Sequence, residues 1–388
     1  MQKDKKALII TTVSGFLIQF ELSNVQILQD MGYEVHYASN FQVPVYLQSF
    51  DYKKSGINIH PVPIQKKPWR LTQNIKAFFN IRSLVKRENF QLIHCHTPMG
   101  GVMGRLVTIG MKHQPWILYT AHGFHFYKGA PMLKFIPYYI VERILALRTN
   151  CLITVNQEDY DYATKFQLRK NSFVRQIPGV GVSIDRFSAN ISKVKRCDLN
   201  IPEDSLFLLS VGEINRNKNH ITVLRAVAKL RNPRLFYGIC GSGNANYVQY
   251  LKEEVSKLGI EQQVCFFGYQ SEVTNYLNLV DVFIFPSIRE GLGMAALEAM
   301  AAGLPIIAAD NRGTREYMVD GYNGFVVSPL DVQGFADAIV KMQSVSFRKR
   351  AGLNSRKQVQ KFGKEHVNSI MKQIYQESER RMKDENHR

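Results

Sequence analysis

The sequence predicts an α/β protein built from two doubly wound domains, each with a parallel sheet. Short apolar runs alternate with longer amphipathic stretches along most of the 388 residues. The alternation is interrupted once, by a polar stretch at residues 188–204, and then restarts. Repeated strand–helix alternation favours parallel sheets covered by helices on both faces. The chain length suits about two domains of ~150 residues each.

The first domain is expected to span residues 1–188. Short apolar runs predict its strands at 7–12, 34–38, 57–61, 92–95, 117–120, 152–155 and 174–177. Longer stretches with apolar residues at helical spacing predict helices, for example at 71–87, 131–147 and 158–167. A glycine turn at Gly15 follows the first strand.

The second domain is expected to span residues 189–345, beginning with the polar linker. Its strands are predicted at 207–211, 235–239, 264–267, 282–285, 306–308 and 324–327, and helices between them at 220–230, 247–258 and 334–342. Residues 346–388 are predicted to form a long polar helix. In such folds ligands bind at the carboxyl ends of the strands, here in a cleft between the two domains.

Composition narrows the class and the compartment. Hydrophobic residues make up 45% of the chain, which is ample for two cores. Five widely spaced cysteines without a Cys-x-x-Cys pair predict free thiols in a reducing cytoplasm, not disulfides or a zinc framework. The apolar stretch 7–20 contains several polar residues and lacks a small-residue cleavage site, so it is interpreted as a strand and turn, not a signal peptide. No run reaches the ~18 apolar residues of a spanning helix.

The chain is strongly basic, with a net charge of +18 that is concentrated in the first half. Basic side chains are interleaved there with aromatic ones, as in Lys66, Lys67, Trp69, Arg70 and Phe79. This pattern suits an anionic membrane surface, to which each Lys or Arg contributes ~1 kcal/mol. A solvated basic face and a nucleic-acid surface are the alternatives, and we favour the membrane.

Residues 285–303 carry the strongest functional pattern. An apolar strand is followed by a loop with Gly291 and Gly293, and then by an alanine-rich helix. Glycines allow the backbone to approach a ligand closely, and a helix N-terminus favours a phosphate. Glu290 in the loop can accept hydrogen bonds from sugar hydroxyls, and Glu298 in the helix can bind a ribose diol. An ordinary helix start with a nearby acid would look similar in isolation.

Four blocks together resemble the retaining GT-B glycosyltransferases of family four, in the branch that builds bacterial surface polysaccharides and glycans. The resemblance covers nearly the whole chain. It implies two Rossmann-like domains facing across a cleft, with the C-terminal helix crossing back to the first domain. The blocks are Thr11-Thr-Val-Ser-Gly15; Ile93-His-Cys-His-Thr-Pro98 with Tyr119-Thr-Ala-His-Gly-Phe-His125; Val211-Gly-Glu-Ile-Asn-Arg-Asn-Lys-Asn-His220; and Glu290 to Glu298 continuing to Asn311-Arg-Gly-Thr-Arg-Glu316 and Gly321-Tyr-Asn-Gly-Phe325.

The resemblance implies roles for individual residues. Glu290 and His122 would contact the donor sugar, Glu298 the ribose, and Lys218 the diphosphate, with Gly15 facing the diphosphate. Backbone N–H groups toward the sugar and diphosphate are expected from the loop of Gly291, Leu292, Gly293, Met294 and Ala295.

One position departs from the family pattern. Many members carry an arginine where this chain has Glu213, as one half of an arginine–lysine pair on the diphosphate. Either the nearby Arg216 substitutes for it, or Lys218 and the helix N-terminus suffice.

Further polar residues have alternative interpretations. His94 and His96 share one face of a strand, but without a third ligand in the sequence no metal is expected. His96 and Thr97 are expected on the acceptor side, and His125 is either a second residue there or a packed one. The Asp159-Tyr-Asp161 segment is interpreted as a helix start. Gly241-Ser-Gly243 is either a ligand loop or a plain turn.

The sequence and the family that it resembles together imply a cytoplasmic, peripheral, retaining glycosyltransferase that needs no metal and no cofactor beyond its sugar nucleotide. It would move an N-acetylhexosamine or hexose from a UDP donor to an undecaprenyl-diphosphate-linked saccharide at the inner face of the plasma membrane. The alternatives are a UDP-N-acetylglucosamine 2-epimerase of the same fold and a basic nucleic-acid-binding protein.

Overall fold

The computed structural model describes residues 5–42, 50–188 and 192–386. The chain divides into two compact units, Met1–Gly181 with Glu365–Arg388, and Val182–Lys364. The sequence predicts domain boundaries at residues 188 and 345. In the structure α6 (Ile184–Ser188) and α12 (Val345–Val359) both belong to the second unit, because they pack against α10 (Met294–Ala301).

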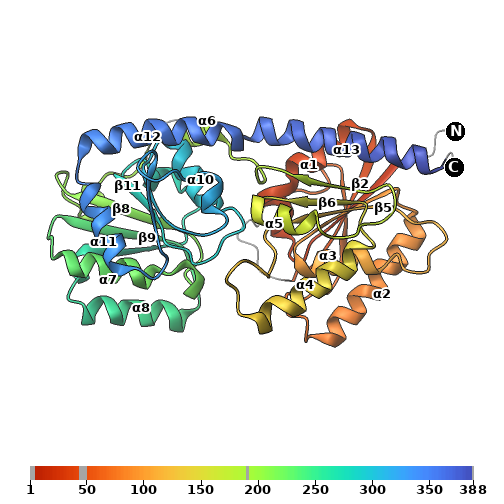
Figure 1. Cartoon of the computed structure of the whole chain (residues 1–388), viewed down its shortest axis with the longest axis horizontal. Coiled ribbons are helices and arrows are strands. Elements are labelled where there is room, and N and C mark those ends of the chain that lie inside the picture. The colour runs from red at the N-terminus through yellow and green to blue at the C-terminus, as the bar shows by residue number, and fades with distance from the viewer. Residues whose placement is uncertain (1–4, 43–49, 189–191, 387–388) are drawn as a thin grey trace. The chain divides into compact units, whose positions relative to one another are not determined.

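The first unit contains a parallel seven-stranded sheet with the order β3-β2-β1-β4-β5-β6-β7 (Figure 1). The predicted strands of this unit are confirmed, with shifts of a residue or two at their ends. Their bounds are β1 Lys5–Ile10, β2 Tyr33–Ser39, β3 Ile57–Pro61, β4 Leu92–His96, β5 Trp116–Ala121, β6 Cys151–Thr154 and β7 Phe173–Gln176.

Helices cover both faces of this sheet. Helices α1 and α13 lie over one face, and α2, α3 and α4 over the other (Figure 1). A short π-helix, η1, precedes α1 directly, which is an unusual element that often occurs at functional sites. The bounds are η1 Leu17–Glu21, α1 Leu22–Asp30, α2 Leu71–Glu88, α3 Pro98–Leu106, α4 Met132–Ala146, α5 Gln157–Ala163 and α13 Lys364–Asn386.

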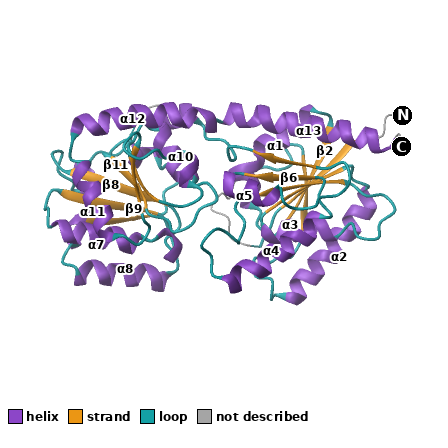
Figure 2. Ribbon diagram, viewed as in Figure 1, coloured by secondary structure: helices purple, strands orange, loops and turns teal. Residues whose placement is uncertain are grey.

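The second unit contains a parallel six-stranded sheet with the order β10-β9-β8-β11-β12-β13 (Figure 2). Helices α7, α8 and α11 lie on one face, and α10 and α12 on the other. Its strands are β8 Leu206–Val211, β9 Leu235–Cys240, β10 Val264–Gly268, β11 Val282–Phe285, β12 Ile306–Ala309 and β13 Gly324–Val327. The remaining helices are α7 His220–Leu230, α8 Ala245–Lys257, α9 Thr274–Leu277 and α11 Val332–Lys341, with single 3₁₀ turns at η2 Cys197–Leu199, η3 Arg216–Lys218, η4 Glu261–Gln263, η5 Thr314–Glu316 and η6 Gln360–Phe362.

The C-terminal segment differs from the prediction of one long helix. It forms two helices, α12 and α13, separated by η6 and Gly363. Gly363 has an extended backbone and forms a bridge with Val182, so its conformation interrupts the helix. The chain leaves the second unit at this break and rejoins the first.

The strands are continuous apolar runs because each sheet is covered on both faces. Every residue of β4, β5, β6, β9, β11 and β12 is buried. The five cysteines are free thiols, as predicted. Among the described residues, no helix has both the length and the apolar character that crossing a bilayer requires.

Parallel strands bring all their carboxyl ends to one edge of a sheet. In the first unit this edge carries the loops after β1, β4 and β5, and in the second the loops after β8, β9, β11 and β12. The site residues predicted from the sequence lie mostly in these loops.

Candidate active site

The loop between β11 and α10 requires glycine at position 293. Gly293 has φ +99°, and a Cβ placed there would lie 2.6 Å from Cε1 of Phe285 and 3.0 Å from the Tyr317 hydroxyl. It is the N-cap of α10 and makes no side-chain capping bond. The first N–H groups of a helix have no intrahelical partner, so those of Met294 and Ala295 are suited to an anion.

Lys218 and Glu290 form an ion pair beside this helix start. Nζ of Lys218 lies 2.6 Å from Oε1 of Glu290, and both side chains are largely buried. The ammonium also lies 5.0 Å from the centre of the Phe285 ring, where a cation–π attraction adds to the ion pair. A Cβ on Gly212 would lie 3.2 Å from Cε of Lys218, so the lysine stem packs closely along the backbone after β8.

Backbone hydrogen bonds fix the loop of Lys218 against the loop of Glu290. The Ile288 N–H donates to the Asn217 carbonyl at 2.8 Å, and Nδ2 of Asn217 donates to the Arg289 carbonyl at 2.8 Å. Nδ2 of Asn219 donates to the carbonyls of Pro286 and Pro329. The ion pair is therefore held by two joined loops and not only by its own attraction.

The loop after β12 supports Glu290 from its other side. Oδ1 of Asn311 accepts hydrogen bonds from the N–H groups of Gly313 and Thr314, which shapes the turn. Nε of Arg312 donates to the Glu290 carbonyl at 3.3 Å. A Cβ on Gly313 would lie 3.0 Å from Cβ of Glu290 and 2.9 Å from the backbone of Leu292. Close packing of the Glu290 loop therefore requires a residue without a Cβ at position 313.

Glu298 lies on α10, one helix turn beyond the loop. Burial raises the pKa of its carboxyl to about 7, and the charge of Arg186 in the same unit opposes part of that rise. The buried carboxyl therefore keeps its proton to a higher pH than an exposed glutamate does, and hydrogen-bond donors that favour the ionised form would lower its pKa.

Arg216 and Glu213 are not members of the Lys218–Glu290 ion pair. Both side chains are exposed, and Arg216 lines an open pocket with Ile221, Asn244, Asn246, Tyr247 and Tyr250. A Cβ on Gly241 would lie 1.8 Å from the Gly212 carbonyl oxygen, and one on Gly243 would lie 2.1 Å from that of Ile214. Packing against the backbone of the loop after β8 thus requires both glycines even without a ligand. This favours the interpretation of residues 241–243 as a plain turn.

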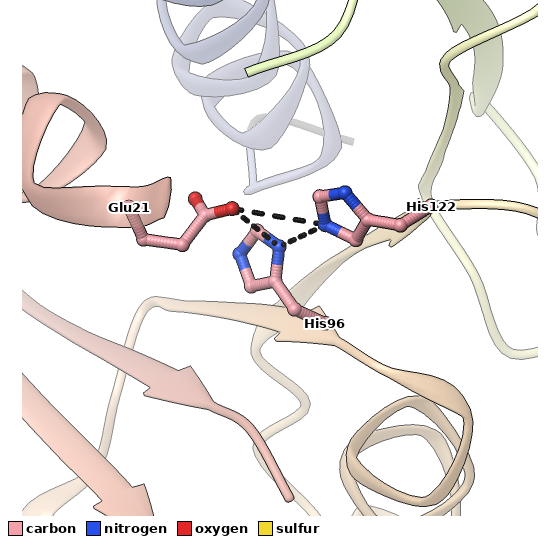
Figure 3. A group of neighbouring side chains, drawn as sticks. All are labelled: Glu21, His96 and His122. Atoms are coloured by element: carbon pink, nitrogen blue, oxygen red, sulfur yellow. Dashed lines mark hydrogen bonds and ion pairs between the residues drawn. The ribbon is translucent and has the colours of Figure 1, made fainter. Parts of the chain in front are cut away.

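In the first unit, His96 and His122 meet a carboxylate that no sequence motif marks (Figure 3). Glu21, at the end of η1, is 1% exposed, and its Oε1 lies 3.2 Å from Nδ1 of His96 and 3.7 Å from Nε2 of His122. Nδ1 of His96 lies 3.2 Å from Nε2 of His122. Oε2 of Glu21 accepts a hydrogen bond from Nδ2 of Asn24.

Desolvation dominates the protonation of this cluster. Burial raises the pKa of Glu21 to about 8, although the Asn24 hydrogen bond opposes the shift. Burial lowers the pKa of His122 to about 4 and holds that of His96 well below its usual value. Burial disfavours the charged form of each of these three side chains. By themselves, they therefore favour a protonated Glu21 and two neutral histidines.

The remaining predicted residues of this unit have structural contacts. Both ring nitrogens of His94 have partners, the Tyr375 hydroxyl at 2.7 Å and Oγ1 of Thr120 at 2.8 Å. Oγ1 of Thr97 accepts from the Thr12 N–H, which fixes the loop after β1 where Gly15 is buried. The His125 ring packs against the Tyr138 ring, with 5.0 Å between the two ring centres.

The Asp159 segment is a helix start, as predicted. Asn156 is the N-cap of α5, and its side chain accepts a hydrogen bond from the Asp159 N–H. Oδ2 of Asp159 in turn accepts from the Phe124 N–H.

Comparison with known proteins defines the class of the chain. Residues 5–156 match the family described as Glycosyl transferase 4-like, and residues 192–365 match Glycosyl transferases group 1. The chain is 37% identical over 379 residues to the "Putative glycosyltransferase EpsD" of Bacillus subtilis (strain 168), covering 96% of both chains. It belongs to the family-four glycosyltransferases with the GT-B fold, which confirms the resemblance seen in its motifs.

Two further proteins are similar to the chain, one in sequence and one in fold. The "UDP-Gal:alpha-D-GlcNAc-diphosphoundecaprenol alpha-1,3-galactosyltransferase" of Escherichia coli is 25% identical over 299 residues, which is 75% of this chain and 76% of that protein. The crystal structure of Anabaena Alr3699/HepE in complex with UDP-glucose superposes with a TM-score of 0.75 at 18% identity. That match covers 96% of this chain and 99% of the other.

Proposed function

We propose that the protein is a retaining glycosyltransferase that moves a hexose or N-acetylhexosamine from a UDP donor to a lipid-linked saccharide. The Lys218–Glu290 pair beside the glycine-bounded start of α10 is the observation that carries this proposal. It combines a cation for a diphosphate, helix N–H donors and a carboxylate for sugar hydroxyls within one unit. The names of the Escherichia coli relative and of the UDP-glucose complex support a UDP donor and a diphosphoundecaprenol acceptor.

The chemistry of the departing nucleotide explains these residue types. When the glycosidic bond to the donor breaks, negative charge develops on the β-phosphate. Lys218 and the N–H groups of Met294 and Ala295 stabilise that charge, and a well-placed donor is worth ~3–4 kcal/mol. Glu290 accepts hydrogen bonds from the donor sugar, and Glu298 accepts them from the ribose hydroxyls. The acceptor attacks from the face that the phosphate leaves, so no protein nucleophile is assigned.

The first unit supplies the remaining contacts in this proposal. Gly15 faces the diphosphate and His122 contacts the donor sugar. His96, Thr97 and His125 belong to the acceptor side. Arg216 adds positive charge near the donor without replacing Lys218.

Membrane attachment through the first unit is part of the proposal. Helix α4 is apolar on its exposed side, and Leu133 is 92% exposed. Helices α2 and α4 flank α3 on the same face of the sheet. Basic residues accompany both helices, which suits an anionic lipid surface. The exposed apolar residues are Met132, Leu133, Ile136, Tyr138, Ile140, Val141, Ile144 and Leu147 around α4, and Trp69, Leu71, Ile75 and Phe79 at α2. The exposed basic ones are Lys66, Lys67, Arg70, Lys76, Lys86, Arg87, Lys134 and Arg143.

Release of free UDP from a panel of UDP-sugars, with and without a membrane-lipid extract of the source organism, tests the proposal. We expect release from one sugar, rising when the extract is added. Conversion of UDP-N-acetylglucosamine without UDP release would instead indicate the epimerase. Steeply salt-dependent nucleic-acid binding without affinity for any UDP-sugar would indicate a nucleic-acid-binding protein.

A further inference from the structure

Three potential ligand atoms converge between the η1 helix and the ends of β4 and β5 in the first unit (Figure 3). They are Oε1 of Glu21, Nδ1 of His96 and Nε2 of His122, separated by 3.2, 3.2 and 3.7 Å. The side chains come from three segments that are far apart in the sequence. Their convergence is therefore produced by the tertiary fold and not by a local turn.

The size of this triangle matches a metal coordination sphere. A point equidistant from three atoms with these separations lies about 2 Å from each, which is the bond length of zinc to histidine nitrogen and carboxylate oxygen. Ligand atoms around a tetrahedral zinc lie roughly 3.3 Å apart at such bond lengths. Two histidines and one glutamate are also a donor set that zinc uses in proteins.

The buried carboxylate of Glu21 also favours a bound cation. Glu21 is 1% exposed, and within the described part of the chain no ion pair joins it to a lysine or arginine. A buried carboxylate needs a compensating cation or a proton. Side chains of Glu21 and His122 also border a cavity of about 10 Å³, enough for roughly one water molecule.

A second Glu–His–His group in the same unit, Glu34, His36 and His60, lacks the convergent arrangement of the first. His36 contacts His60 through Nδ1 at 2.9 Å and Glu34 through Nε2 at 3.0 Å. Its two partners lie on opposite sides of one imidazole ring, so the three ligand atoms share no common point. The residue types are the same, and only the Glu21 group has convergent geometry.

We propose that Glu21, His96 and His122 bind one divalent transition-metal ion, with zinc as the best fit. The ion fastens the η1 helix to the ends of β4 and β5, next to the buried loop of Gly15. No metal was expected from the sequence, because only His94 was considered as a partner of His96. In the fold His94 is bonded to Tyr375 and Thr120, and the other ligands come from η1 and the end of β5. Metal binding at this site can be measured without the proposed transferase activity, to which His96 and His122 are also assigned.

Metal content of the full-length protein, purified without a histidine tag, tests the inference. We expect one zinc per chain by elemental analysis, loss of the ion with a chelator, and a fall in the melting temperature of the metal-free form. Cobalt(II) added to that form should give the visible absorption of a tetrahedral nitrogen–oxygen site. H122Q and E21Q should each lower the metal content at least tenfold.

H60Q is the matched control, because it removes a histidine from the other Glu–His–His group in the same unit. It should retain one zinc per chain. H122Q alters a half-buried side chain and is expected to fold, so loss of metal there can be read separately from loss of structure. Wild-type protein that takes up neither zinc nor cobalt, or equal metal content in H122Q and wild type, would overturn the inference. In that case a proton shared among the three side chains balances the buried carboxyl.

Discussion

The ammonium of Lys218 and the carboxylate of Glu290 lie 2.6 Å apart although 72 residues separate them in the chain. The two residues lie in loops that follow the neighbouring strands β8 and β11. One backbone hydrogen bond, from Ile288 to Asn217, and one bond from the Asn217 side chain to the Arg289 carbonyl join these loops. In the proposed donor site, a diphosphate would compete with Glu290 for this lysine. The two residues should therefore respond differently to substitution.

Lys218→Ala should weaken UDP binding and lower the rate of UDP release about 10²–10³-fold, because the developing phosphate charge loses its fixed cation. Binding by calorimetry and turnover with the active UDP-sugar measure both effects. Lys257→Ala is the control, since Lys257 is an exposed lysine paired with Glu254 on α8. Full turnover in Lys218→Ala would contradict the donor-site assignment.

Glu290→Gln should separate binding from turnover. It keeps the size of the side chain but removes the negative charge beside Lys218, so UDP should bind as tightly as to wild type or several-fold more tightly. Turnover should fall roughly 10²-fold, because the donor sugar loses a charged hydrogen-bond acceptor. A parallel loss of UDP affinity would mean that Glu290 acts by positioning Lys218 and not by binding the sugar.

Gly293→Ala should destabilise the second unit by roughly 2–4 kcal/mol. Part of the cost is the left-handed backbone, and part is the contact of the new Cβ with the Phe285 ring. Gly259→Ala isolates the first term, since Gly259 has φ +66° and no atom lies within 4 Å of the position that its new methyl group would take. It should cost about 1 kcal/mol. Urea unfolding of both variants measures the difference, and equal losses would show that the Phe285 ring moves aside.

Glu298 should make the stability of the second unit depend on pH. Burial raises the pKa of its carboxyl from about 4.5 to about 7, so between these values the folded chain holds a proton that the unfolded chain releases. The contribution of Glu298 to the free energy of unfolding is therefore full below pH 4.5 and declines as the pH rises to about 7. Above that pH the contribution no longer changes. Melting temperatures of wild type and Glu298→Gln between pH 5 and 8 measure this, and the variant should show the smaller decline. Parallel curves would exclude the shift.

The fold was predictable because its signals are local. Buried parallel strands are continuous apolar runs, so strands such as β4 and β11 could be recognised without knowledge of their neighbours. The break between α12 and α13 was not recognised, since it depends on the bridge from Gly363 to Val182. A tertiary contact of this kind leaves no periodic pattern in the sequence.

Sequence motifs marked candidate site residues only where those residues lie within single loops. Glu290 and Gly293 were named from the glycine loop before α10, and Lys218 was named from the resemblance of its block to the family. Glu21 was missed, because one acid within an apolar stretch is no signal until η1 turns it toward His96 and His122. The hydrogen bond from Arg312 to the Glu290 carbonyl likewise could not be predicted from the sequence, because it joins the loops after two different strands.

Membrane attachment should depend on apolar contact as well as charge. Leu133→Asp with Ile144→Asp should reduce binding to vesicles containing anionic lipid at least tenfold, because both side chains are exposed on α4 and would enter the lipid interface. Replacing Lys66, Lys67 and Arg70 together by Ala should weaken binding mainly at low salt, since salt screens the electrostatic contribution.

Leu353→Asp on α12 is the control, because Leu353 is an exposed leucine in the second unit. Sedimentation with vesicles measures all three. Unchanged binding of the α4 variant would place the membrane contact elsewhere, and equal loss in Leu353→Asp would show that the effect is not specific to the first unit.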